Sequence, residues 1–410
     1  MATRPGMLVL AVGTTLVQQS LSYMSALVVP VAAPELAKVV GLPVALAGFY
    51  LGLLYSGSMI IMLFAGGFIR KFGAVRMSQY ALFGMGAGLA LGVIGEAWAL
   101  ALGAILIGTS SAYSTPASSD ILARYAPPKH AALIFSIKQT GVPAGGILAG
   151  IVVPFLLVNF GWQGVFYGTS ALCISLAILL QPFRRLFDQN RNPAHRISPD
   201  QAVKTLKGVL IPTHFRHLVY ATFTYCGLQG IFAAFFVSYL EGELGFTLVE
   251  AGAIFAVSQV ASVVARIFWG WVMDRVGGAR PVLSFLGISM AGFSVGVALL
   301  VPGWGEMVIT LVAMGYSATA ISWHGVVLAE VANISKPGMV ATNTGGVLSF
   351  AVGGQFFYPF VMGGLLTLGG TYGLGFALGA APALVVGLLF ARRPPAPTAA
   401  AEAEPDATTA

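Results

Sequence analysis

Charged side chains are scarce in this sequence: they make up 9% of its 410 residues, whereas 57% are apolar. A soluble domain carries about 25% charged residues, so the composition excludes an ordinary soluble enzyme and a disordered chain. The two cysteines, Cys173 and Cys226, both lie in apolar runs, which excludes a disulfide-stapled fold. Lipid is the solvent in which such a composition is stable, so the chain is predicted to be a membrane protein.

Apolar stretches long enough to cross a bilayer recur along the chain. A helix needs roughly 20 apolar residues to span about 30 Å of hydrocarbon. The alternation typical of outer-membrane strands is absent from the sequence. We therefore expect an all-α membrane protein with twelve transmembrane helices, at 7–29, 45–69, 77–95, 98–119, 132–157, 163–181, 217–239, 249–273, 281–301, 306–330, 341–366 and 371–391.

Basic residues are distributed unevenly between the loops. If the N-terminus is cytoplasmic, the loops on that side carry 18 of the 21 lysines and arginines, and the outer loops carry only Lys38. This asymmetry fits the positive-inside rule. It predicts a multi-pass protein of a bacterial cytoplasmic (inner) membrane with both termini inside. It also explains the formal charge of +7 as a topology signal, so no nucleic-acid partner is expected.

The chain divides into two similar halves. We expect a six-helix bundle over 1–181, a basic cytoplasmic linker over 182–215, a second six-helix bundle over 216–391 and a disordered cytoplasmic tail over 392–410. A short motif repeats at an offset of 204 residues. Its matching positions are Gly66 with Gly270, Lys71 with Arg275, Gly73 with Gly277, and Arg76 with Arg280. Repeated halves are typical of alternating-access transporters, whose site lies between them.

The second copy of this motif, from Gly270 to Gly277, resembles the loop signature of the major facilitator superfamily. In the first copy Arg70 stands where the family usually has aspartate. The resemblance implies a transporter, not an enzyme, with two pseudo-symmetric six-helix bundles. It implies that spans 1, 4, 7 and 10 line a cavity, that 2, 5, 8 and 11 flank the interface, and that 3, 6, 9 and 12 lie outside.

Charged residues also gather at the cytoplasmic ends of the spans. Asp274, Arg275 and Glu330 lie there in the second half, and Arg70, Lys71 and Asp120 occupy the corresponding places in the first. We expect Asp274, Arg275, Glu330 and Asp120 to act in gating, as charge pairs that hold the cytoplasmic side closed and release when the halves rock. The alternative is a solvated positive-inside anchor.

Two cations lie within the spans, where ionisable residues are costly and indicate function. Arg266 in span 8 and Lys138 in span 5 are each roughly 12 Å deep at about 1.5 Å per residue. The resemblance implies that these spans face each other. Unpaired buried cations are unstable, and a bound anion would supply the missing charge. Arginine binds a carboxylate through two parallel hydrogen bonds, and lysine acts as a point charge.

The surroundings of Arg266 resemble span 8 of the bacterial monocarboxylate and oxalate carriers, where that arginine binds the carboxylate. Those carriers often have aspartate four residues earlier, whereas this chain has Ser262. The segment from Phe135 to Pro143 resembles span 5 of organic-anion and nitrate-type carriers.

Other polar residues within the spans are candidates to line the cavity. We expect Tyr113, Gln18 and Tyr358 to contact the substrate, although each could instead bond between helices. His324 in span 10 has an ordinary pKa near 6.5 and is a candidate for proton coupling. The alternative is a neutral histidine with its hydrogen bonds satisfied.

The sequence thus predicts a monomeric secondary carrier for a small organic anion, a mono- or dicarboxylate, working by alternating access with proton symport. An anion exchanger, including one for nitrate, is an alternative. So are a proton-driven drug or metabolite exporter, which would be expected to bury an acid in span 1 or 4, and a non-transporting membrane sensor. No catalytic, metal or cofactor motif is present in the sequence, and the partners expected are the anion, protons and lipid.

Overall fold

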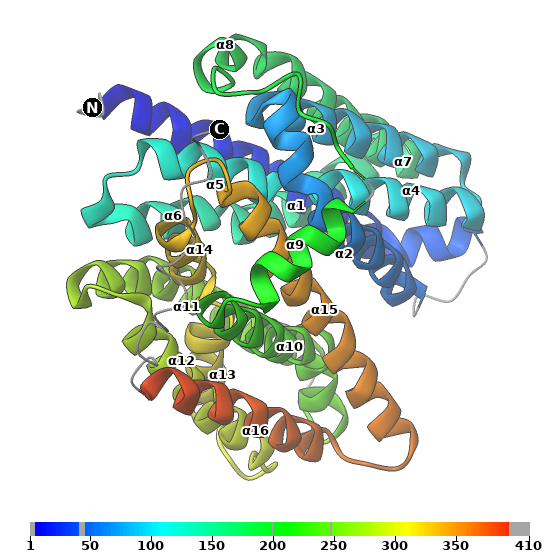
Figure 1. Ribbon diagram of the computed structural model, residues 1–410. Coiled ribbons are helices and arrows are strands. Elements are labelled where there is room, and N and C mark those ends of the chain that lie inside the picture. The colour runs from blue at the N-terminus through cyan, green and yellow to red at the C-terminus, as the bar shows by residue number, and fades with distance from the viewer. Residues whose placement is uncertain (1–4, 41–45, 199, 247, 393–410) are drawn as a thin grey trace.

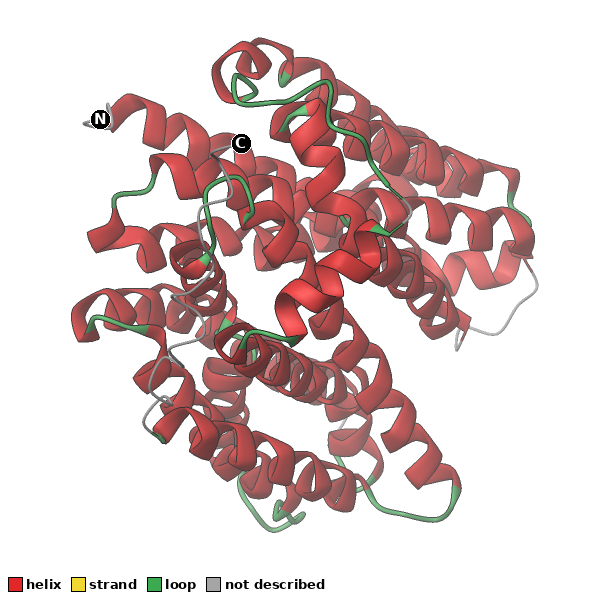
Figure 2. Ribbon diagram, viewed as in Figure 1, coloured by secondary structure: helices red, strands yellow, loops and turns green. Residues whose placement is uncertain are grey.

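The computed structural model describes residues 5–40, 46–198, 200–246 and 248–392, and every regular element in these ranges is a helix (Figures 1 and 2). The predicted tail lies outside the described residues from position 393 onward. Large apolar side chains are exposed on the outer faces, among them Val158 at 83% and Phe360 at 71%. Such surfaces are stable against lipid rather than water, which confirms the predicted all-helical membrane fold.

The first half of the chain contains the helices coloured from blue through cyan to blue-green in Figure 1. They are α1 (Pro5–Val40), α2 (Leu46–Phe72), α3 (Ala74–Leu91), α4 (Ala97–Ser111), α5 (Ser114–Tyr125), α6 (Ala131–Gln139) and α7 (Gly141–Leu179). Predicted span 4 is divided into α4 and α5. Predicted span 5 is divided into α6 and the first part of α7.

Spans 5 and 6 are joined almost without a loop. Helix α7 turns at Gly161, whose φ of 70° lies in the left-handed region that favours glycine. Residues 128–187 consequently count as one candidate span, and eleven candidate spans rather than twelve are found among the described residues.

The second half contains the helices coloured green to red. They are α10 (Thr213–Gly242), α11 (Leu248–Val276), α12 (Ala279–Ala298), α13 (Glu306–Ala320), α14 (His324–Ile334), α15 (Val340–Thr367) and α16 (Tyr372–Ala391). Predicted span 10 is divided into α13 and α14, as span 4 is in the first half. Between the halves lie two short helices, α8 (Arg184–Phe187) and α9 (Gln201–Leu210).

We call the end of the molecule at which Arg70, Arg275 and the linker 182–215 lie the basic end. The two halves meet there, through α2 and α5 against α15 and through α6 against α11 and α14. Helix α9 lies across this junction (Figure 1) and contacts α2, α10 and α15. Its Thr205 hydroxyl donates to the carbonyl of Leu63 at 2.8 Å.

Close packing at the junction depends on glycine. A Cβ atom on Gly66 would lie 1.9 Å from Oγ1 of Thr342 in the other half. At the second contact Ser136 of α6 packs against Gly270 of α11 and Gly325 of α14. The two bundles can therefore approach at the basic end only because these positions carry no side chain.

Candidate functional site

A break in span 5 creates the centre of the site. Helix α6 ends at Gln139 and α7 begins at Gly141. Proline has no backbone N–H, so Pro143 cannot donate to the carbonyl four residues earlier, which belongs to Gln139. That carbonyl is instead the acceptor for Arg266, whose Nη1 lies 3.0 Å away. The break thus turns a backbone oxygen toward the other half of the protein.

Lys138 lies beside this break and is only 1% exposed. Its Nζ donates to Oε1 of Gln19 on α1 at 2.8 Å and to Oε1 of Gln139 at 3.0 Å. The same Gln19 oxygen accepts a bond from Oγ1 of Thr115 on α5 at 3.1 Å. Both acceptors are neutral amides, so they satisfy donors of the ammonium group without cancelling its charge.

Arg266 lies on α11 and is 2% exposed. Its Nε is buried and has no hydrogen-bond partner within the described ranges. Tyr23 of α1 and Cys226 of α10 are close enough to interact electrostatically with its guanidinium group. An unpaired buried donor on a charged group carries a large desolvation cost, so this N–H is available to an additional oxygen acceptor.

The structure brings the two predicted cations together, because Gln139 bonds to both of them. Among the described residues, neither Lys138 nor Arg266 forms an ion pair with an acid. Coulomb attraction to an anion is strong in such a poorly solvated position. The arrangement can therefore bind an oxyanion between a residue of the first half and a residue of the second.

The predicted lining residues make contacts to other groups. Nε2 of Gln18 donates to Oγ of Ser114 at 2.8 Å, which joins α1 to α5. Tyr113 packs edge-on against Phe68, with 5.7 Å between ring centroids. The ring of Tyr358 packs against Phe223 at 5.7 Å. In this arrangement these three side chains serve contacts between helices.

His324 is the first residue of α14. Its ring stacks on Trp323, with centroids 3.8 Å apart, and its Nδ1 lies 3.3 Å from the carbonyl oxygen of Ile321. Both Arg266 and Lys138 are close enough to act on it electrostatically. The structure therefore places the candidate proton carrier near the two cations. The adjacent Trp323 has a buried indole Nε1 without a hydrogen-bond partner in the part of the chain that the structure describes.

Two important residues were not selected as binding residues from the sequence. Gln19 is one of several polar residues in span 1, and nothing in the sequence alone distinguishes it from its neighbour Gln18. Gln139 lies in the segment from Phe135 to Pro143, which is informative in the sequence only as a resemblance. The position of Pro143 four residues later is the signal that its carbonyl is free to bond elsewhere.

At the basic end the two halves are joined by a contact that differs from the charge pairs expected. The carboxylate of Asp274 on α11 accepts bonds from the backbone N–H groups of Ala132 and Leu133, at 3.1 and 3.0 Å. These are among the first amides of α6, which have no partner within the helix. Asp274 thus joins the two halves by capping a helix N-terminus, where a negative charge is favourable.

The other predicted gating residues form local contacts. Arg275 lies over the ring of Trp271 in its own helix, 5.0 Å from the centroid. Asp120 pairs with Arg124 one turn later at 3.0 Å. Glu330 lies within electrostatic reach of Arg280. Of these groups, Asp274 has the bonds that cross between the halves.

Replacing Asp274 with asparagine is expected to weaken closure of the basic end. The carboxylate charge would be lost and one acceptor would become a donor, at a cost of about 1 kcal/mol. Spin labels on α6 and α11 should then show a larger population of long distances across the basic end. Asp200→Asn is the matched control, because Asp200 lies in the linker and pairs with Lys204. Unchanged distances in Asp274→Asn would contradict this role.

Comparison with known proteins agrees with the architecture. The sequence is 24% identical to the cis,cis-muconate transport protein of Acinetobacter baylyi (strain ATCC 33305 / BD413 / ADP1), covering 69% of this chain and 68% of that one. It is 25% identical to the hexuronate transporter of Bacillus subtilis (strain 168), covering 75% and 79%.

The fold resembles that of the human organic anion transporter MFSD10, with a TM-score of 0.75, 15% identity and coverage of 94% of this chain and 100% of that chain. The family model of the Major Facilitator Superfamily matches residues 15–333 and 218–410. The paired bundles, the repeated motif and these matches show that the chain belongs to the major facilitator superfamily, a family of membrane transporters rather than enzymes.

Proposed function

We propose that the protein is a secondary carrier for a small mono- or dicarboxylate, which it binds at Arg266 and Lys138. The observation that carries this proposal is the meeting of two buried cations at Gln139 with no acid paired to either among the described residues. The relatives named for transport of muconate and hexuronate, both organic acids, support the same substrate class.

The binding step follows from the hydrogen bonds around the two cations. A carboxylate would accept from Nε of Arg266, which has no partner among the residues described, and from the remaining donors of the guanidinium group. It would displace an amide oxygen of Gln19 or Gln139 from Lys138. Charge-assisted bonds to a carboxylate are about twice as strong as neutral ones, so the exchange is favourable.

The same geometry links binding to rocking of the halves. Lys138 belongs to the bundle 1–181 and Arg266 to the bundle 216–391, so an anion bound to both favours the arrangement in which they are close. We infer that the basic end faces the cytoplasm of a bacterial inner membrane, with both termini on that side, because basic loops favour it. The contacts at that end then correspond to a carrier closed to the cytoplasm.

Proton coupling would use His324. A third positive charge near Arg266 and Lys138 is opposed by repulsion, and a bound anion removes that repulsion. Anion and proton would therefore bind more strongly together than separately, which is the requirement for symport.

Uptake by purified protein in liposomes tests the proposal. We expect uptake of labelled muconate or hexuronate, no uptake of glucose, and stimulation when the acidic side is outside. Stimulation only by the same anion inside the liposomes would indicate exchange and exclude symport. The assigned substrate class would be contradicted if neither muconate, hexuronate nor related mono- and dicarboxylates entered the liposomes. It would also be contradicted if none of them raised the melting temperature of the protein.

A further inference from the structure

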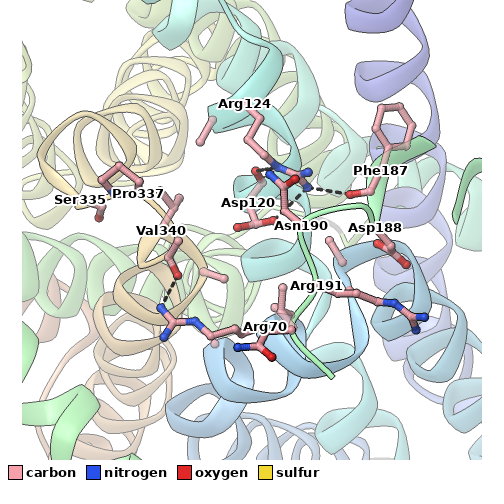
Figure 3. A pocket seen from close by; sticks show the side chains of 18 of the residues that line it. Arg70, Asp120, Arg124, Phe187, Asp188, Asn190, Arg191, Ser335, Pro337 and Val340 are labelled. Carbon is pink, nitrogen blue, oxygen red and sulfur yellow. Dashed lines mark hydrogen bonds and ion pairs between the residues drawn. The ribbon is translucent and has the colours of Figure 1, made fainter. Parts of the chain in front are cut away.

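A positively charged cavity lies at the basic end, away from Arg266. Its volume is about 610 Å³, and it is bounded by both halves and the linker. Arg70, Arg124 and Arg191 line it, together with the acids Asp120 and Asp188. Figure 3 shows Arg70 and Arg124 approaching it from different helices.

The two acids are already bonded to other groups. Asp188 accepts from the backbone amides of Val75 and Arg76 at 2.8 and 3.0 Å, at the beginning of α3. Burial raises the pKa of its carboxyl group, and these two bonds oppose that rise. Asp120 pairs with Arg124. Arg70 acts on Asp120 only at longer range, and neither Arg70 nor Arg191 forms a direct ion pair among the described residues. Three arginines and two acids line the cavity, so the lining has a surplus of positive charge.

The internal repeat shows that this cavity carries an arginine where the second half of the chain has an aspartate. Arg70 occupies the repeat position of Asp274, at the offset of 204 residues. Asp274 caps the N-terminus of α6 in the other half. Arg70 likewise reaches the start of a helix in the other half, α15, where its Nη2 lies 2.8 Å from the carbonyl oxygen of Gly338 and 3.0 Å from the sulfur of Met339.

The substitution reverses the sign of the charge at this junction. The first amides of α15 favour a negative group, as those of α6 do, yet the side chain beside them is a cation. In the described part of the chain no carboxylate takes the place at α15 that Asp274 takes at α6. An oxyanion in the cavity would accept from Arg70 and lie near these amides at the same time.

We propose that this cavity binds a small oxyanion of the phosphate or carboxylate type, which replaces the missing carboxylate of the first repeat. The anion joins Arg70 in one half to the beginning of α15 in the other and stabilises the closed basic end. This second site lies on the basic face, so anions on that side regulate rocking without being transported. The inference is independent of the substrate proposed for Arg266.

Calorimetric titration of the purified, detergent-solubilised protein with inorganic phosphate tests the proposal. Wild type and Arg266→Gln are expected to bind phosphate equally. Arg70→Asp restores the acid found in the second repeat and should weaken binding by at least about tenfold. Lys71→Asp is the matched control, since it makes the same charge change one residue away, outside the cavity lining, and should bind like wild type.

Several results would overturn the proposal: no phosphate binding by wild type at millimolar concentrations, equal affinity in Arg70→Asp, or loss of binding in Arg266→Gln, which would assign the phosphate to the central site. Arg70→Gln provides the same test if Arg70→Asp does not fold. Repeating the titration in phosphatidylglycerol and phosphatidylcholine nanodiscs shows whether the bound oxyanion is a soluble anion or a lipid headgroup. Binding in both indicates a soluble anion, and loss only in phosphatidylglycerol indicates that a lipid headgroup fills the cavity.

Discussion

Replacing Arg266 with glutamine is expected to reduce carboxylate uptake by about 30-fold or more. Truncating one partner of a buried charge-assisted contact costs about 2–5 kcal/mol, and each 1.4 kcal/mol is a factor of about ten. The guanidinium group has a free Nε and a bond to the carbonyl of Gln139, so its loss removes both the charge and the bidentate geometry. The assay is initial uptake in liposomes, with protein incorporation measured in parallel.

Two further variants separate charge from geometry. Arg266→Lys keeps the charge but lacks the planar fork, so we expect uptake to remain strongly reduced. Gln139→Glu supplies an acid of nearly the same shape in contact with Lys138, next to the backbone carbonyl that bonds to Arg266. It should raise the melting temperature of the substrate-free protein and abolish uptake, because the internal carboxylate competes with the substrate. Uptake at the wild-type rate in Arg266→Gln would exclude this residue from binding.

The second large effect is expected at the glycine contacts of the junction. A Cβ atom on Gly325 would lie 2.0 Å from Oγ and 2.7 Å from Cα of Ser136. The second of these is a backbone atom, so rotation of the serine side chain cannot relieve the overlap. Overpacking of this kind costs typically about 1–3 kcal/mol, and occasionally more. Gly325→Leu is therefore expected to prevent closure of the basic end and to lower turnover roughly 10- to 100-fold.

Distances between spin labels across the basic end measure this loss of closure directly, and liposome uptake measures turnover in parallel. Gly325→Leu should shift the molecules toward an arrangement open at the basic end, while each bundle remains folded. Gly292→Leu is the matched control, because nothing lies within 4 Å of a Cβ atom placed at that position of α12. Turnover and distances equal to those of wild type in Gly325→Leu would show that the halves do not need this contact.

Most of the fold can be predicted from hydrophobic runs, because lipid imposes a minimum length on each span. The positions at which spans 4, 5 and 10 break could not be placed in the same way. Pro143 explains the break at Thr140. Pro116 stands in the same relation to the break after Ser111, because it lies four residues after Ala112 and has no N–H to donate to that carbonyl. The break after Ala320 has no proline within the following turn.

The candidate site was predicted in part. Lys138 and Arg266 stand out because charge is rare in a span, and the structure buries both of them. Their common contact with Gln139 could not be predicted, since it depends on how α6 and α11 pack. Asp274 was expected in a charge pair, but its contact is with the backbone of α6. The sequence shows which residue carries the charge. It does not show which backbone amide will be the partner, because every residue except proline has one.

The oxygen of Gln139 that accepts the hydrogen bond from Arg266 also belongs to the backbone. It is available because an imino acid follows four positions later. Alanine scanning would therefore pass over this acceptor, since Gln139→Ala leaves the peptide oxygen in place. Its genetic determinant is the codon for Pro143. Libraries that seek altered substrate preference should vary that codon together with the neighbouring polar positions.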